Sequence, residues 1–184
     1  MIIQLNTPLT HQSIQSLKAG DMVELTGSVY TARDAAHQKL TELILAGEKL
    51  PFELKDQIIY YAGPCPAPEG RVIGSAGPTT SGRMDKYAPR LIEMGLTGMI
   101  GKGQRNAAVV EAMRRYGAVY FGAVGGAGAL ISKCVASSEL IAFSELGTEA
   151  VRKLSVVKFP AVVVIDQYGN NLYDSGRKQY ALEP

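Results

Sequence analysis

Three cationic side chains of this sequence stand where apolar, strand-like stretches give way to turns: Arg33, Arg83 and Lys102. Turns at the ends of strands commonly present side chains to ligands. A guanidinium also matches the geometry of a carboxylate or a phosphate. If the three turns meet at one end of a sheet, they form a pocket for an anion, whereas separated turns leave three solvated surface charges.

The segment 74–85 reads as a glycine-rich turn between a short strand at 72–73 and a helix. Its hydroxyl residues at 79–81 suit the N-terminal cap of that helix. Free backbone N–H groups and the positive end of the helix dipole then favour an anion beside Arg83. The alternative interpretation is an ordinary capped helix with Arg83 on the surface.

Two glycine-rich matches to nucleotide-binding motifs are incomplete. In the Gly-Lys-Gly run at 101–103 the lysine is followed by glycine, and Leu96 stands where a phosphate loop has its first glycine. The small-residue stretch 122–129 leads to Ile131 where a dinucleotide fingerprint needs glycine or alanine. We therefore predict no nucleotide site, and we expect the stretch 122–129 to allow a close approach of backbones.

Length and charge limit the classes of protein to consider. The 184 residues are enough for one sizeable core, and we expect a single domain over 1–184. A net charge of +2 without a basic stripe argues against a nucleic-acid partner. No apolar run reaches the roughly eighteen residues of a membrane helix. The start at 1–6 lacks the features of a secretory signal.

The two cysteines, Cys65 and Cys134, belong to no Cys-x-x-Cys pair, and no histidine pair has metal-binding spacing. We therefore expect that the chain alone binds no iron–sulfur cluster and no structural zinc. Cys134 is expected to be a buried small apolar residue, whereas Cys65 lies in a proline-rich loop and its role is open. Without other signs of secretion, the pattern predicts reduced thiols and a cytoplasmic location.

Periodicity predicts an α/β fold with a mixed sheet. Strands are expected at 2–5, 22–26, 28–31, 58–61, 72–73, 98–101, 119–121, 135–143 and 156–166, with a break at Gly27. Helices are expected at 35–46, 89–94, 107–115 and, as a short segment, 149–154. A hairpin turn is expected at 168–170, followed by a polar tail that frays after Tyr173.

Several motifs in a fixed order carry a family resemblance. They are Thr-Ala-Arg-Asp-Ala-Ala-His at 31–37, Tyr-Ala-Gly-Pro at 61–64, Gly-Pro-Thr-Thr-Ser-Gly-Arg-Met-Asp at 77–85, Gly-Lys-Gly at 101–103, Gly-Gly-Ala at 125–127, and Phe-Pro-Ala at 159–161 with Asp166 and Gly-Asn at 169–170. Over nearly the whole chain this set resembles the β subunit of class I iron–sulfur hydro-lyases, which include class I fumarase and L(+)-tartrate dehydratase. In one-chain members the same region is the C-terminal domain.

The resemblance implies a swivelling β/β/α domain and a partner α subunit that carries an oxygen-sensitive 4Fe-4S cluster on three cysteines. One iron of that cluster binds the substrate as a Lewis acid. The present chain is then expected to close over the cluster and to supply the pocket for a small dicarboxylate. The implied activity is the reversible hydration of fumarate to L-malate, with the α subunit required.

Five residues match the family's site by position. The resemblance makes Arg33, Arg83 and Lys102 contacts of the substrate carboxylates, Thr79 the base for the C–H proton, and Thr80 its neighbour in the pocket. Cations aimed at the carboxylate stabilise the charge that builds up when the adjacent proton leaves.

A hydroxyl such as that of Thr79 is a poor base unless a neighbour favours its deprotonated form. His37, one helical turn after Arg33, is a second candidate base, against the interpretation that it is structural.

Two alternatives stay open at the level of sequence. A tartrate dehydratase β subunit differs in its substrate by one hydroxyl. A non-catalytic binding or scaffold subunit would keep the pocket without an active partner.

Overall fold

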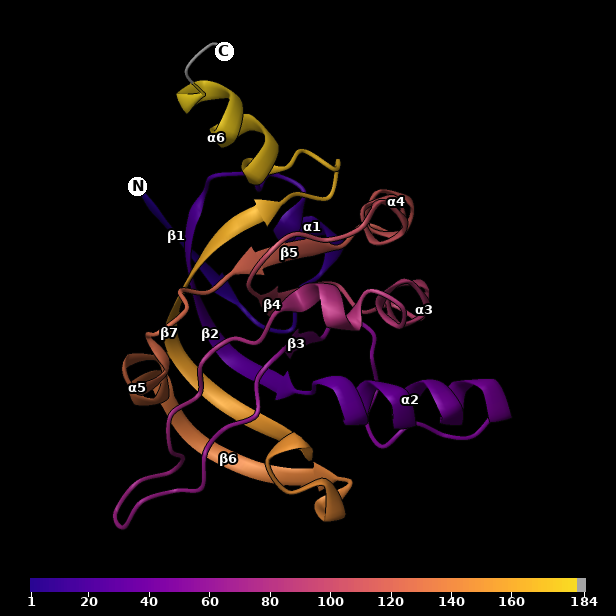
Figure 1. Cartoon of the computed structure of the whole chain (residues 1–184), viewed down its shortest axis with the longest axis vertical. Helices are drawn as coiled ribbons and strands as arrows, with labels where there is room; N and C mark the ends of the chain where they lie inside the picture. Colours follow the sequence, from indigo (N-terminus) through magenta and orange to yellow (C-terminus); the bar gives the residue numbers. More distant parts are fainter. Residues whose placement is uncertain (182–184) are drawn as a thin grey trace.

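In the computed structural model, which describes residues 1–181, seven strands form one mixed sheet in the order β1-β2-β3-β4-β5-β7-β6 (Figure 1). The strands are β1 (Ile2–Asn6), β2 (Met22–Thr31), β3 (Ile58–Tyr60), β4 (Gly98–Gly101), β5 (Val119–Gly122), β6 (Val135–Ala142) and β7 (Val151–Ile165). Strands β2 to β5 run parallel, whereas β7 is antiparallel to β2, β5 and β6. Because β7 pairs with both β5 and β2, the sheet is partly closed as a barrel. The predicted mixed α/β fold is confirmed.

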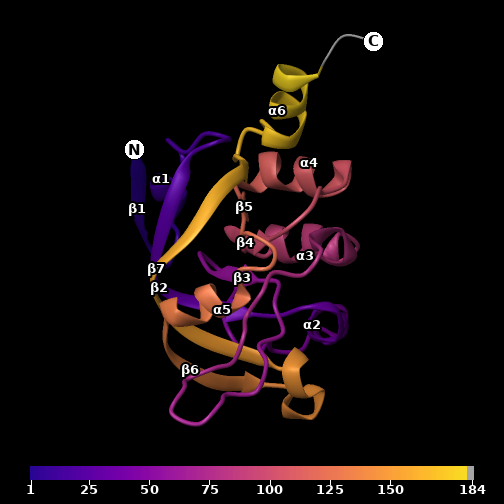
Figure 2. The same ribbon diagram turned by 60° about the vertical axis from the view of Figure 1, so that its left-hand side comes forward.

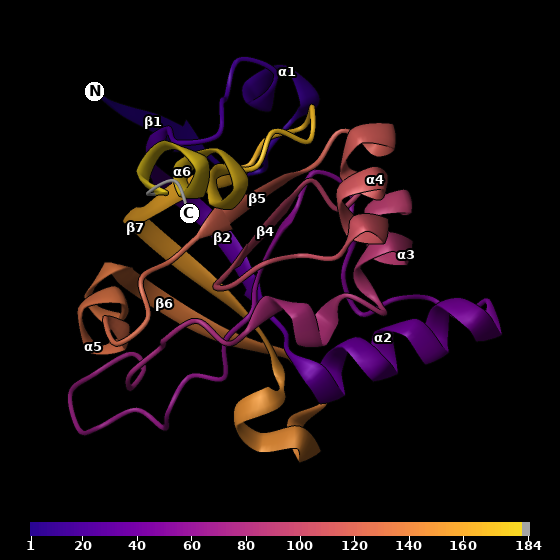
Figure 3. The same ribbon diagram turned by 45° about the horizontal axis from the view of Figure 1, so that its top comes forward.

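Helices cover the outer face of the parallel strands. The helices are α1 (His11–Ile14), α2 (Asp34–Ala46), α3 (Ala88–Glu93), α4 (Ala107–Tyr116), α5 (Gly128–Ile131) and α6 (Leu172–Tyr180), with 3-10 helices η1 (Ser81–Met84), η2 (Ser132–Cys134) and η3 (Ser144–Glu149). Helices α2, α3 and α4 lie on one side of the sheet in all three views (Figures 1, 2 and 3). None of the helices described here combines the length and apolarity that a membrane crossing requires.

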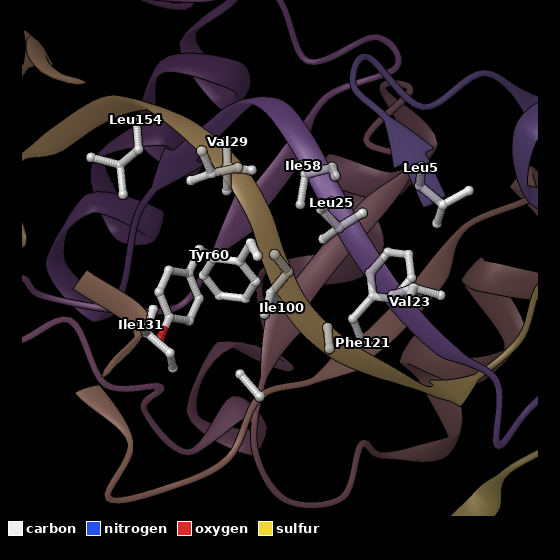
Figure 4. Close-up of a cluster of buried hydrophobic side chains, with 14 of the residues drawn as sticks. Leu5, Val23, Leu25, Val29, Ile58, Tyr60, Ile100, Phe121, Ile131 and Leu154 are labelled. Carbon is white, nitrogen blue, oxygen red and sulfur yellow. The ribbon is translucent and has the colours of Figure 1, made fainter. Parts of the chain in front are cut away.

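Alternation along the strands builds two cores. Ile58 and Tyr60 of β3 point into the barrel, where they meet Leu25, Phe121 and the other side chains of Figure 4. Ile59 points the other way, into the layer between the sheet and α2, α3 and α4. Since both faces of β3 are covered, its run of apolar residues is continuous, as expected for a buried parallel strand.

Four sequence predictions are wrong, because contacts that form only in the folded chain determine the structure of these segments. The expected break at Gly27 is a change of register against β7, and β2 continues through it. Residues 151–154 are the start of strand β7, flanked by β2 and β6, and not a helix. The tight turn predicted at 168–170 does form, with an antiparallel bridge between Ile165 and Asn171. The predicted frayed tail after Tyr173 is wrong, because helix α6 continues to Tyr180. The part of the predicted tail at 182–184 lies outside the described residues.

The fourth wrong prediction is the strand at 72–73. The loop that holds these residues bonds to itself: Cys65 N donates to Ser75 O at 2.9 Å, and Gly74 N donates to Cys65 O at 3.0 Å. No edge of the sheet is therefore used by this segment. The loop runs beside α5, in keeping with the hydrogen bond of 3.0 Å from Ala76 N to Gly128 O (Figures 1 and 2).

The close approach predicted for 122–129 is confirmed at Gly128. A Cβ at this position would meet Ser75 Oγ, and it would lie 2.7 Å from Gly77 N. Contacts of this kind force the neighbouring backbone to move. Gly128 therefore fixes how α5 supports the segment that leads to Thr79.

We expect Gly128→Ala to lower the free energy of unfolding by about 1–3 kcal/mol, because the added methyl group overpacks this contact. The measurement is the midpoint of urea unfolding. Gly176→Ala is the matched control, since nothing lies within 4 Å of a Cβ at that helical position, and it should be neutral or stabilising. A wild-type midpoint for Gly128→Ala would contradict the prediction.

Candidate functional site

The segment 79–81 is held between the carboxyl ends of β3 and β4. Thr79 N donates to Tyr61 O at 2.7 Å, Lys102 N donates to Thr79 O at 3.3 Å, and Ser81 N donates to Lys102 O at 2.8 Å. Thr80 and Lys102 thereby form an isolated parallel bridge. The segment acts as a short extension of the sheet, so the two threonines and the lysine have fixed backbone positions.

The predicted anion-binding helix N-terminus is not what this segment forms. Thr80 precedes the 3-10 helix η1, only four residues long, and its side chain makes no capping hydrogen bond. The longer helix α3 begins at Ala88, with Pro89 in its first turn as predicted. The physical reason is that the N–H groups of Thr79 and Ser81 bond to β3 and β4 instead of facing a ligand.

The side chains of Ser81 and Tyr120 pack against the turn around Lys102. A Cβ at Gly101 would collide with Ser81 Oγ, so only glycine fits there. The Tyr120 hydroxyl group donates to Gly103 O at 2.9 Å and lies 2.9 Å from Ser81 Oγ. Lys102 itself is exposed, and it forms no ion pair within residues 1–181.

Arg33 and Arg83 are joined by one carboxylate, that of Asp34. Arg83 Nε and Nη2 donate to its two oxygens at 2.8 and 2.6 Å, and Arg33 Nε donates at 3.2 Å. Partial burial by itself raises the pKa of Asp34, but hydrogen bonds from its own backbone and Arg33, with the charges of both arginines, lower the pKa overall. Asp34 is therefore ionised at neutral pH and holds the two guanidinium groups together.

Glu149 of η3 is a second carboxylate at this place. Its Oε1 lies 3.3 Å from Arg33 Nη2, and its Oε2 accepts a hydrogen bond of 2.8 Å from Ala35 N at the start of α2. The sequence analysis missed both carboxylates. The position of Asp34 directly after Arg33 was a usable signal, whereas no sequence pattern links Glu149 to residues more than a hundred positions earlier.

The five predicted residues therefore come to one edge of the sheet. Arg33 follows β2, Thr79 bonds to the residue after β3, and Lys102 follows β4, and these three strands are parallel neighbours. Arg83 reaches the same edge through Asp34. Arg33 and Arg83 are thus joined through Asp34, and Lys102 follows β4, the next strand but one from β2.

His37 is a structural residue and not a candidate base. It is fully buried, its Nδ1 lies 3.0 Å from Arg33 O, and its ring meets Tyr61 edge-on at 5.2 Å. In the part of the chain that is described, its Nε2 is the one buried side-chain nitrogen or oxygen without a hydrogen-bond partner. Burial lowers the pKa of His37 to about 4, so the ring is neutral near pH 7.

A buried ion pair, missed by the sequence analysis, lies beneath the site. Arg105 Nε donates to Asp85 Oδ1 at 2.6 Å, and Asp85 Oδ2 accepts 2.6 Å from Asn106 N at the start of α4. The guanidinium also lies 5.3 Å from the ring centre of Tyr61 and 5.1 Å from that of Tyr120. This cluster joins the end of η1 to the start of α4 behind the segment 79–81.

The chain's own donors do not suit an iron–sulfur cluster. Cys65 is exposed and Cys134 is partly buried, and both are free thiols. Within residues 1–181, no three His, Cys, Asp or Glu side chains come together as a metal site. Four-iron clusters are usually held by more thiolates than one chain with two cysteines offers.

Known proteins are similar to this chain over most of its length. The model of the family described as "Fumarase C-terminus" matches residues 1–176. The chain belongs to this family. It is 39% identical over 175 residues to "Fumarate hydratase class I, anaerobic" of Escherichia coli (strain K12), an alignment that covers 93% of this chain and 32% of that protein. It is 40% identical over 175 residues to "Fumarate hydratase 2" of Leishmania major, with 93% and 31% covered.

A relative of similar length is also found. The chain is 40% identical over 177 residues to "Putative L(+)-tartrate dehydratase subunit beta" of Methanocaldococcus jannaschii, with 93% of this chain and 91% of that protein covered. In contrast, the chain spans about a third of the length of the fumarate hydratases that it matches. The resemblance that the motifs predicted is thus confirmed at the level of the fumarase C-terminus family.

We expect Asp85→Asn to lower the free energy of unfolding by about 3–5 kcal/mol, because it leaves the Arg105 guanidinium buried without its counter-charge. Denaturant unfolding measures this loss. The control is Glu111→Gln, which removes an exposed partner 3.6 Å from Arg114 and should cost no more than about 1 kcal/mol. Equal effects of the two substitutions would show that the buried pair is not a foundation of the site.

His37 should make the stability of this fumarase C-terminus chain depend on pH. Its folded pKa of about 4 is below the ordinary value of 6.5, so the unfolded chain takes up the proton first as the pH falls. The contribution of neutral His37 is complete above about pH 6.5 and is lost towards pH 4, at up to about 1.4 kcal/mol per pH unit.

The measurement is the free energy of unfolding of wild type and His37→Phe between pH 7 and pH 4. Phenylalanine keeps a ring against Tyr61 but does not titrate. The wild-type curve should fall more steeply than that of the variant, and parallel curves would contradict the assignment.

Proposed function

We propose that this chain is the β subunit of an iron–sulfur-dependent hydro-lyase that catalyses the reversible hydration of fumarate to L-malate. The observation that carries the proposal is the gathering of Arg33, Thr79, Thr80, Arg83 and Lys102 at the carboxyl ends of β2, β3 and β4. We also propose that residues 1–184 act as one domain that supplies the wall of the active site binding the substrate.

The open position of these residues supports a partner subunit. Thr80, Arg83 and Lys102 are exposed, while a hollow of about 320 Å³ nearby is lined by other residues, among them Cys65 and Arg152. Proton abstraction beside a carboxylate is favoured where water is excluded. A second surface over the cations would complete such a site, and the longer fumarate hydratases contain chain beyond the matched third.

The roles of the side chains follow from where charge develops. Removing a proton next to a carboxylate of malate places negative charge on that carboxylate, and the guanidinium groups of Arg33 and Arg83 stabilise it. Thr79, fixed by two backbone hydrogen bonds, takes the proton. Lys102, whose backbone N–H donates to Thr79 O at 3.3 Å, favours the deprotonated hydroxyl that this step needs. Thr80 binds the substrate beside it.

We place the 4Fe-4S cluster on an α subunit. The described residues of this chain include two cysteines, and no three His, Cys, Asp or Glu side chains among them come together as a metal site. No step assigned to this chain passes through the cluster. Free thiols at Cys65 and Cys134 suit a reducing compartment, and we propose the cytoplasm.

The second candidate is the β subunit of an L(+)-tartrate dehydratase. It is favoured by the 40% identity to a protein of that name over 91% of its length. The same cations serve either substrate, since both are small dicarboxylates.

The test is anaerobic assembly with a cluster-bearing α subunit, followed by assays with fumarate, malate and L(+)-tartrate. Turnover of fumarate supports the first proposal, and turnover of tartrate alone supports the second. An intact complex that is inactive on all three substrates overturns both and leaves a scaffold subunit.

We expect Thr79→Ala to lower kcat with little change in KM, and Thr80→Ala mainly to raise KM, because loss of a base and loss of uniform binding differ in this way. A single general base typically contributes about 100- to 10,000-fold. The measurement that decides is the exchange of the malate C3 proton with deuterated solvent. Exchange at the wild-type rate in Thr79→Ala places the base elsewhere.

A further inference from the structure

We propose that Asp34 is the positioning residue of the substrate clamp: it holds Arg33 and Arg83 as one unit with defined donor edges facing the substrate. The inference rests on the proposed function, because it assigns the two arginines to a substrate carboxylate. It adds a residue that the resemblance does not place in the site.

The Arg83 guanidinium has two edges that could bind a carboxylate in bidentate fashion. The Nε–Nη2 edge is occupied by both oxygens of Asp34, at 2.8 and 2.6 Å. Among the described residues, Nη1 makes no hydrogen bond or ion pair. The Nη1–Nη2 edge is therefore the one presented to a ligand, and Asp34 determines its direction.

Arg33 is restrained in a similar way at two points. Its Nε donates to the same Asp34 carboxylate at 3.2 Å, and its Nη2 lies 3.3 Å from Glu149. Glu149 is in turn anchored to Ala35 N at 2.8 Å. With Arg33, Asp34 and Ala35 consecutive, the start of α2 and η3 together form a rigid frame for this side chain.

The charges show that attraction alone does not explain the arrangement. Arg33 and Arg83 contribute +2, and Asp34 and Glu149 contribute −2, so these four groups sum to zero. A site built only to attract a dianion would gain from losing the carboxylates. A site built on directed hydrogen bonds needs them, because an oriented guanidinium loses less freedom on binding.

Asp34→Asn separates the two explanations, since it raises the net charge of the cluster by one. We expect kcat/KM of the assembled complex to fall about 10- to 100-fold, the scale of a misplaced binding group. Attraction alone predicts an equal or higher value, which would overturn the proposal. Glu145→Gln is the matched control: it too removes an ion-paired carboxylate, that of Glu145 in η3, which pairs with Lys39 at 2.7 Å, and it should leave kcat/KM unchanged.

A double-mutant comparison tests whether Asp34 acts through Arg83. In an Arg83→Lys background, which has no Nε–Nη2 edge to orient, Asp34→Asn should have a clearly smaller effect than in wild type. Full additivity of the two substitutions would show that Asp34 does not act through Arg83 and would overturn that part of the proposal.

A readout independent of turnover distinguishes failure of this inference from failure of the proposed function. In ¹⁵N-labelled full chain, the Nε–H signals of Arg33 and Arg83 should be resolved in wild type and Glu145→Gln and shifted or lost in Asp34→Asn. Succinate, an unreactive dicarboxylate, should perturb these signals in wild type. Its affinity for Asp34→Asn should be at least about tenfold lower. Unchanged arginine signals in Asp34→Asn overturn the inference, whereas inactive complexes with these NMR effects overturn only the hydro-lyase assignment.

Discussion

The site depends on the way backbone groups at the ends of β3 and β4 find partners. Tyr61 O, Lys102 N and Lys102 O would be left open where the two strands stop, and the segment 79–81 satisfies all three. A buried backbone group without a partner costs about 1–3 kcal/mol, so this arrangement is strongly preferred over looser ones. Thr79, Thr80 and Lys102 thus lie on a continuation of the sheet.

A second layer of polar contacts keeps that extension in place. Asp85 and Arg105 are nearly fully buried, and each makes further bonds: Asp85 with the start of α4, and Arg105 with the Tyr61 hydroxyl at 3.4 Å. Burying two charges is costly, and such pairs often contribute little net stability compared with apolar side chains of similar size. Their benefit here is a defined geometry, because few alternative arrangements satisfy all of these groups at once.

At the surface, two carboxylates balance the charges of the two arginines and also fix the direction of their guanidinium groups. Asp34 and Glu149 neutralise the two arginines, and Lys102 remains as the cation without a carboxylate among the described pairs. The set lies open at the edge of the barrel, which fits a chain that forms one wall of a shared site. The hollow of about 320 Å³ does not coincide with these side chains, because other residues line it.

By itself the sequence determined the regular elements that have local signals, and its motifs predicted five site residues. Helix α2 ends at Gly47 in the left-handed conformation, as its pattern predicts, and β4 and β5 follow from short apolar runs. Only the tertiary structure decided that 151–154 is strand, that His37 is buried, and that Asp34 joins Arg83 across 49 positions. The physical reason is range: periodicity and caps act between near neighbours in the chain, whereas strand pairing, burial and ion pairs arise only when the closing barrel brings distant residues together.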